Sequence, residues 1–189
     1  MFYESVNKGT ARKTGRPLRM GVVKMFTIGN IVMHPTAGVC QIDDIRDQSF
    51  NGVTKKYYIL HPMSNPQKST IYTPVDSDAV SLRRLLTEPE IQELILASRQ
   101  EQLTWTDNAN IRKGEFNAIL HSDNVARIIA LVTLLHRRRE VVEASGRKFP
   151  IVDERIMLDA EKRIHQEFSY ALKIAEEEVP EYIISRLYG

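Results

Sequence analysis

The sequence predicts an α+β chain of two domains, a small β barrel followed by an all-α helical bundle. Residues 26–82 contain short apolar runs separated by turn residues, which is typical of strands. Residues 83–189 instead carry apolar side chains at the spacing of buried helix faces. The spacing of apolar residues changes from that of strands to that of helices near Leu82, so we place the domain boundary between residues 82 and 83. A hydrophobic fraction of 42% is enough for a core in each part.

Turn residues divide the first part of the chain into short strands. His34–Gly38 reads as a turn, and Asn51-Gly52 favours a tight hairpin because both central residues of such a turn tolerate positive φ. We expect five short strands, including Ile31–Met33, Val39–Ile45, Lys56–Leu60 and Thr70–Pro74. So many strands in fewer than sixty residues are typical of a small, strongly bent sheet of the SH3 or Tudor type.

Five helices are predicted in the second part. Thr87 caps the first helix, Pro89 lies in its first turn, and Glu90 completes a capping box. The third helix is expected at the centre, because its apolar residues form one buried face: Val125, Ile128, Ile129, Val132 and Leu135. The first helix is expected from residue 87 to about residue 102, and the second over residues 108–120. The third begins at the cap Ser122-Asp123 and ends at Gly146. The fourth covers about 152–175, and a short fifth helix follows Pro180.

Cysteine usage and hydropathy indicate the compartment. Cys40 is the one cysteine, so the chain has no intramolecular disulfide, which fits a reducing compartment. No apolar run is long enough to span a bilayer, and the N-terminus lacks the apolar middle region of a secretory signal. We therefore expect a cytoplasmic protein without a membrane partner.

Charge is unevenly distributed along the chain. Residues 1–24 carry six basic residues and one acid, which gives this segment a net charge of +5. Because the whole chain has a net charge of +2, residues 25–189 have a net charge of −3. We expect residues 1–24 to be a basic disordered extension, since they show no periodicity. Two interpretations remain open: an arm that touches nucleic acid electrostatically, or residues upstream of a native start at Met20 or Met25.

Motifs for catalysis are absent from the sequence. It contains neither a G-x-x-x-x-G-K-[ST] loop nor a G-x-G-x-x-G turn, and none of its five histidines pairs with Cys40 or another histidine at metal-ligand spacing. Cys40 lies on a predicted strand and reads as a small buried hydrophobe. Asp43 and Asp44 are strand neighbours and face opposite sides. We expect no enzyme, catalytic residue, metal, cofactor or small-molecule substrate.

The single tryptophan lies in a basic part of the chain. Between Trp105 and Lys148 there are eight basic residues against five acids, including Arg112, Lys113 and Arg137–Arg139. One interpretation is that Trp105 packs between the domains while the arginines offset a helix dipole. The other is that the arginines grip phosphates while the indole wedges against bases in a minor groove.

Landmarks in both halves occur in a recognisable order. Met25–Pro35 and then Gly38 give a hydrophobic start, a Val-rich strand and a Pro–Gly loop, and residues 50–60 give a second hairpin. Trp105, Ser122-Asp123 and Leu135–Arg138 follow in the helical part. This order, over residues 25 to about 175, resembles bacterial transcription regulators of the CarD/CdnL type.

The resemblance implies a partner for each domain. Residues 25–82 would form a Tudor-like domain, similar to that of transcription-repair coupling factors, which docks on the β subunit of bacterial RNA polymerase through an exposed strand edge. Gln48 and Tyr72 fall near its polymerase-facing positions. Residues 83–189 would form a DNA-binding domain that lies on promoter DNA at the upstream fork of the transcription bubble. The protein would then be associated with the nucleoid through the polymerase.

The same resemblance implies roles for individual residues. Trp105 would wedge into the minor groove and slow bubble collapse, and Lys113 would contact the phosphate backbone. Arg112 and Arg137–Arg139 are further candidates from the local basic patch. The alternative function is a protein–protein adaptor that does not bind DNA, with Trp105 as an interdomain packing residue.

The sequence departs from the family pattern in several places. Gly29-Asn30 replaces the family's opening Gly-Asp, and Gln48 and Tyr72 fall where arginine is frequent. Thr106–Asn108 replace basic residues beside the tryptophan, which predicts weaker phosphate contacts there. The segment from Trp105 to Ser122 is also longer, so the role of Lys113 depends on the register of the following helix.

Overall fold

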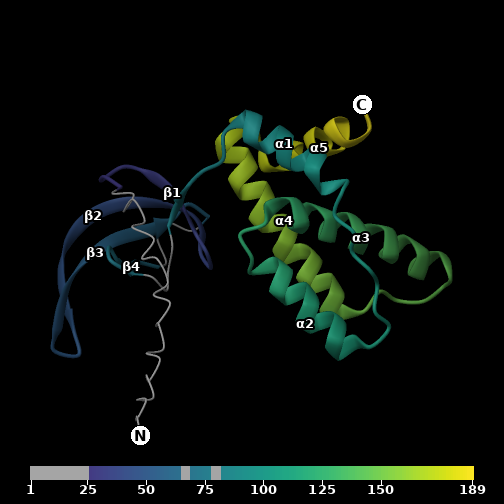
Figure 1. Cartoon of the computed structure of the whole chain (residues 1–189), viewed down its shortest axis with the longest axis horizontal. Coiled ribbons are helices and arrows are strands. Elements are labelled where there is room, and N and C mark those ends of the chain that lie inside the picture. Colours follow the sequence, from purple (N-terminus) through teal and green to yellow (C-terminus); the bar gives the residue numbers. More distant parts are fainter. Residues whose placement is uncertain (1–25, 65–68, 78–81) are drawn as a thin grey trace, which may run out of the picture.

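A β sheet and a bundle of helices make up the chain, shown as a computed structural model in Figure 1. The structure describes residues 26–64, 69–77 and 82–189, so the expected basic extension, residues 1–24, lies outside the described residues. Strands β1–β5 are called the sheet unit and residues 88–189, which contain helices α1–α5, the helical unit. The predicted α+β arrangement is confirmed.

The sheet is antiparallel with the strand order β4-β3-β2-β1-β5. Its central hairpin joins β2 to β3 through Asn51 and Gly52, whose φ angles of 52° and 78° confirm the predicted tight turn. Asp43 is a bulge in β2, where the register with β3 shifts. The strands are β1 Ile31–His34, β2 Gly38–Phe50, β3 Val53–Pro62, β4 Ile71–Pro74 and β5 Arg83–Arg84.

Two features of the sheet differ from the expectation. β2 and β3 have 13 and 10 residues and are long rather than short, because their pairing continues to Phe50 opposite Val53. β5 was not expected, because it lies just beyond the predicted domain boundary, where it pairs with Val32 and Met33 of β1. Within the described residues β4 and β5 remain sheet edges, so closure into a Tudor-like barrel is not confirmed.

One face of the sheet forms its own small core. Val32, Cys40, Ile42, Tyr58 and Leu60 are buried together there. Burial raises the pKa of the Cys40 thiol to about 11, so the thiol stays protonated near neutral pH. Cys40 therefore behaves as the small hydrophobe that its strand position predicts.

The helices match the predicted order. α1 ends at Ser98, earlier than expected, and α3 is capped by Asn124, whose side chain accepts from the backbone N–H of Arg127. Ser122 was expected to cap α3, but its hydroxyl donates to the carbonyl of Ile119 at the end of α2. The bounds are α1 Glu88–Ser98, α2 Ala109–Leu120, α3 Val125–Ala144, α4 Ile151–Leu172 and α5 Val179–Tyr188, with a short 3-10 turn at Glu176–Glu178.

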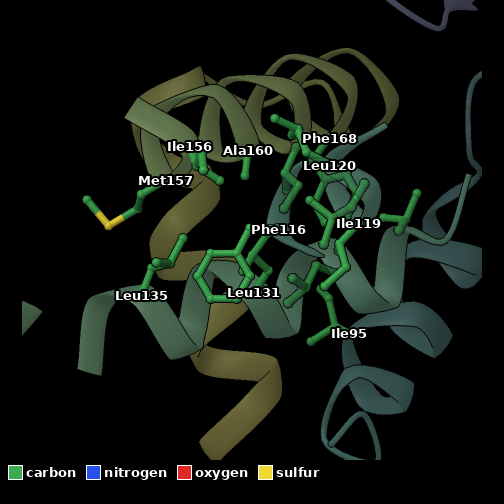
Figure 2. Packing of buried hydrophobic residues seen from close by; sticks show 14 of the residues in the cluster. Ile95, Phe116, Ile119, Leu120, Leu131, Leu135, Ile156, Met157, Ala160 and Phe168 are labelled. Atoms are coloured by element: carbon green, nitrogen blue, oxygen red, sulfur yellow. The ribbon is translucent and has the colours of Figure 1, made fainter. Parts of the chain in front are cut away.

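The helical core lies where α2, α3 and α4 meet (Figure 2). Leu131 and Leu135 of α3 are fully buried, in line with the expected central position of this helix. Phe116 of α2 and Phe168 of α4 are the largest fully buried side chains among the described residues and carry much of the apolar area. Burying one such ring contributes about 1.5–3 kcal/mol to stability.

A partly buried ion pair joins the sheet unit to α4. Arg83 of β5 holds the carboxylate of Glu167 with two N–H groups, one of them at 2.8 Å, and the backbone N–H of Leu86 donates to Glu167 at 3.2 Å. The Glu167 side chain is only 2% exposed. Close by, Gly38 has a φ of +76° and lies against Gln166, where an added Cβ would be 2.8 Å from Oε1. These contacts place α4 directly against the sheet.

Stability should depend on pH through His34, which is buried, and His165, which is half-buried. The ring Nδ1 of His34 accepts the backbone N–H groups of Thr36 and Ala37 at 3.2 and 3.1 Å, which holds the ring neutral. Burial lowers the pKa of His34, and also that of His165 on α4, below the ordinary value of 6.5. On acidification the unfolded chain therefore binds protons before the folded chain does.

We expect the free energy of unfolding to fall as the pH drops below about 6.5, because protonation then favours the unfolded state. Urea unfolding at neutral pH, and again at a pH about one unit below the ordinary histidine pKa of 6.5, measures the loss of unfolding free energy. The variant His34→Asn keeps an acceptor for the Thr36 N–H but does not titrate, so it should lose less stability than the wild type. Equal losses in the two proteins would refute the assignment to His34.

Candidate functional site

Trp105 lies on the connection between α1 and α2 and is half-buried against the helical core. Its ring centroid is 6.2 Å from that of Phe116, in a tilted arrangement. The ring and hydrogen-bond partners described for Trp105 all belong to the helical unit. Arg83, and not Trp105, forms the ion pair between the two units. This placement favours an outward-facing role for Trp105 over interdomain packing.

Two guanidinium groups lie over the indole ring. The Cζ atoms of Arg112 and Arg138 are 4.1 and 4.8 Å from the ring centroid, within the range of cation–π attraction. The indole N–H donates to the carboxylate of Asp107 at 3.1 Å, and Arg138 lies 3.9 Å from the same carboxylate. The sequence placed Trp105 and these arginines in one basic patch, and the structure brings the three side chains together.

Arg112 is not available to a phosphate. Its side chain is 5% exposed and donates to both carboxylate oxygens of Asp153 on α4, at 3.1 and 2.8 Å. Its remaining donors reach the backbone carbonyls of Thr106 and Asp107. The sequence suggested Arg112 as a DNA contact, and we reassign it to the support of Trp105. Burial of Arg112 and exposure of the preceding Ile111 reverse what hydropathy alone predicts.

The other predicted basic residues occupy different surroundings. Lys113 is exposed on α2, beside Arg112, and has no ion pair among the described residues. Arg137 turns towards α5 and donates to the hydroxyl of Tyr188 at 3.1 Å. Arg139 is half-buried, and the described part of the chain offers it no acidic partner. Arg138 therefore lies against Trp105 and keeps exposed surface, and Lys113 is exposed one residue after Arg112 on α2.

An aromatic surface covers the outer face of the sheet beside the edge strand β4. Phe50 makes edge-to-face contacts with Tyr57 at 5.2 Å and with Tyr72 at 5.5 Å. Phe50 and Tyr72 nevertheless remain 45% and 40% exposed. Strand alternation and register place Gln48 on the same face, so both residues expected to face the polymerase lie there. Sequence reasoning missed Phe50 and Tyr57, although their alternation in the hairpin was visible.

A polar cluster lies elsewhere on the sheet. Asp43 pairs with Nδ1 of His61, whose Nε2 lies 3.1 Å from the Thr70 hydroxyl. These three side chains link neighbouring strands on the exposed surface of the sheet. Among the described residues there is no group of three or more potential metal ligands. No helix in the described ranges is long and apolar enough to cross a bilayer.

Comparison with known families identifies the sheet. Residues 26–86 match the model of the CarD-like/TRCF RID domain, which is the RNA polymerase-interacting domain of CarD/CdnL-type proteins. The match spans all five strands and the connection to α1. No curated protein matches the chain. The matched domain is a polymerase-binding module of transcription factors and not a class of enzyme. Residues 26–86 are therefore similar to the CarD-like/TRCF RID domain, which confirms the predicted resemblance over this segment.

Proposed function

We propose that this protein is a transcription regulator that binds the β subunit of bacterial RNA polymerase through its sheet. In this proposal the helical unit contacts promoter DNA at the upstream fork of the bubble and stabilises the open complex. The observation that carries it is the RID match over all five described strands, combined with the aromatic surface beside β4, an edge strand among those described. The chain would act in the cytoplasm, wherever the polymerase engages DNA.

The sheet offers two features that suit a protein partner. Among the described residues β4 is an edge strand without a strand partner on its outer side, so its backbone groups there can extend a partner's sheet. Phe50, Tyr57 and Tyr72 lie on the face beside that edge, and exposed aromatic rings are the residues most often found at the energetic centre of an interface. Strand pairing would set the register, while the rings and Gln48 would supply side-chain contacts.

Tyr72→Ala in the full chain is expected to weaken polymerase binding at least about tenfold, the loss usual for a central interface residue. Tyr170→Ala is a matched control, because Tyr170 is 39% exposed on α4 and Tyr72 is 40% exposed on β4. Binding to purified core polymerase, followed by surface plasmon resonance, measures both. If the two variants bind equally well, the aromatic surface is not the interface.

The helical unit supplies the DNA contact in this proposal. Trp105 is half-buried, Arg138 carries positive charge over its ring, and Lys113 adds an exposed cation on α2. An aromatic side chain that fills an opened base step stabilises the melted strands, since unstacking costs a few kcal/mol per step. A protein with higher affinity for the open promoter than for the closed one shifts that equilibrium without catalytic groups.

Asp107 distinguishes this site from a purely basic one. Its side chain is 95% exposed and accepts the indole N–H of Trp105. A carboxylate at this position repels phosphates, so the DNA contact relies on the indole ring and on Lys113 and Arg138. Because the indole N–H is already donated to Asp107, the ring would meet the bases as an apolar surface rather than as a hydrogen-bond donor.

A further inference from the structure

The proposed wedge is carried by a connection without regular structure. Residues 101–106 lie between α1 and α2 in neither a helix nor a strand, so no regular backbone pattern orients Trp105. A ring that must enter a base step loses affinity if it first has to be ordered. The contacts of Trp105 therefore raise the question of which group fixes it.

Arg112 contacts both the ring and the backbone that carries it. From α2 its guanidinium lies 4.1 Å from the indole centroid. Nη1 of the same group donates to the carbonyls of Thr106 and Asp107 at 2.6 and 3.3 Å, the two residues that follow Trp105. On its other side the group donates to both oxygens of Asp153. One planar cation thus connects α4, the chain after Trp105 and the indole face.

Only arginine has the chemistry for these simultaneous contacts. Its guanidinium is flat, permanently charged and able to stack while it donates in its own plane. Asp153 is 2% exposed in its side chain and neutralises the charge, so the cation stays buried against the ring. Cation–π attraction is stronger for such a desolvated pair than at an open surface. Arg138 is 38% exposed and bridges the ring to Asp107, so it lacks the buried anchor.

We infer that Arg112, anchored by Asp153, is the positioning residue of Trp105. It fixes the path of the backbone after Trp105 and the plane of the indole, so the ring is in place before DNA arrives. Asp153 and Arg112 lie 41 residues apart in sequence, so α4 takes part in orienting a group on the α1–α2 connection. The inference rests on the proposed function for the DNA consequence, but the positioning itself is a property of the protein alone.

Trp105 fluorescence gives a direct test, because the chain has one tryptophan. Arg112→Lys keeps the positive charge but loses the planar guanidinium and its several N–H donors. Arg155→Lys makes the same change at an exposed arginine of α4. In the full chain we expect Arg112→Lys to shift the emission maximum to the red and to raise the acrylamide quenching constant about twofold, from loss of the stacked cation. Arg155→Lys should match the wild type. If the two lysine variants give the same spectrum and quenching, the inference is overturned.

A double variant separates positioning from stability. Arg112→Met with Asp153→Leu replaces the buried ion pair by apolar groups, a change that is often neutral for folding. We expect it to bind polymerase normally and to shorten the lifetime of open promoter complexes about tenfold relative to the wild type, equivalent to about 1.4 kcal/mol. A wild-type lifetime for this variant would refute the positioning role, provided that Trp105→Ala itself shortens the lifetime.

Failure of the proposed function has a different signature. If Trp105→Ala leaves open complexes unchanged, the DNA role is wrong, and the quenching of Arg112→Lys still decides the positioning role by itself. If the double variant does not fold, the spectrum of Arg112→Lys decides in the same way, since that variant retains a cation beside Asp153.

Discussion

Asp153→Ala is expected to lower the free energy of unfolding by about 3 kcal/mol, because it leaves a buried guanidinium without its anion. The Arg112–Asp153 pair is almost fully enclosed, with side-chain exposures of 5% and 2%. Arg112 would keep its bonds to the carbonyls of Thr106 and Asp107, which places the loss at the lower end of the range for broken buried pairs. Urea unfolding followed by far-UV circular dichroism measures it.

Asp159→Ala provides the comparison for this prediction. Asp159 is an exposed acid on the same helix, and no ion pair is described for it, so its loss should change stability by no more than about 0.5 kcal/mol. If the free energies of unfolding of the two variants differ by less than about 1 kcal/mol, the Arg112–Asp153 pair contributes little to stability, because the cost of desolvating the two charges then offsets their attraction.

Glu167→Ala is expected to have the second large effect, again about 3 kcal/mol or more. Glu167 faces two cations, Arg83 of β5 and Arg163 of α4. Burial lowers the pKa of Arg163, and the nearby charge of Arg83 lowers it further. Without the carboxylate these two guanidinium groups lose the acid that lies between the sheet and α4. Mutual repulsion then adds to the unpaired charge of Arg83.

The loss of Glu167 should also uncouple the two units. In the wild type, Trp105 fluorescence, which reports the helical unit, and tyrosine signals from the sheet should change at the same urea concentration. In Glu167→Ala we expect the sheet unit to unfold at a lower urea concentration than the helical unit. Glu154→Ala, an exposed change on α4, serves as the control. Coincident transitions in Glu167→Ala, with stability near that of the wild type, would contradict this account of the interface.

Periodicity identified most of the fold because the core positions are local patterns. The Asn51-Gly52 turn, the buried face of α3 and the start of α1 follow from residues close together in sequence. β5 was not predicted, because Arg83-Arg84 has no strand pattern of its own and its pairing with β1 is decided by tertiary contacts. Ser122-Asp123-Asn124 contains three capping residues in a row, and only the backbone geometry selects Asn124.

The candidate site was predicted less completely, because its chemistry depends on distant partners. Sequence spacing placed Arg112 with the other cations near Trp105, which the ring distances agree with. Its burial depends on Asp153 of another helix, and no local pattern identifies that partner. The aromatic surface on the sheet depends similarly on β4 lying beside the hairpin, which brings Tyr72 to Phe50.

The lifetime of open promoter complexes tests the central claim most directly. Complexes of polymerase and promoter DNA are formed with the wild-type protein, Trp105→Ala or the surface control Tyr170→Ala, then challenged with a polyanionic competitor. The wild type and Tyr170→Ala should prolong the lifetime of the open complex. Trp105→Ala should still bind polymerase, but the lifetime with this variant should be about tenfold shorter than with the wild type, in line with the energy of base–aromatic stacking. A folded Trp105→Ala that prolongs the lifetime as well as the wild type does would contradict the claim that this tryptophan holds the promoter open.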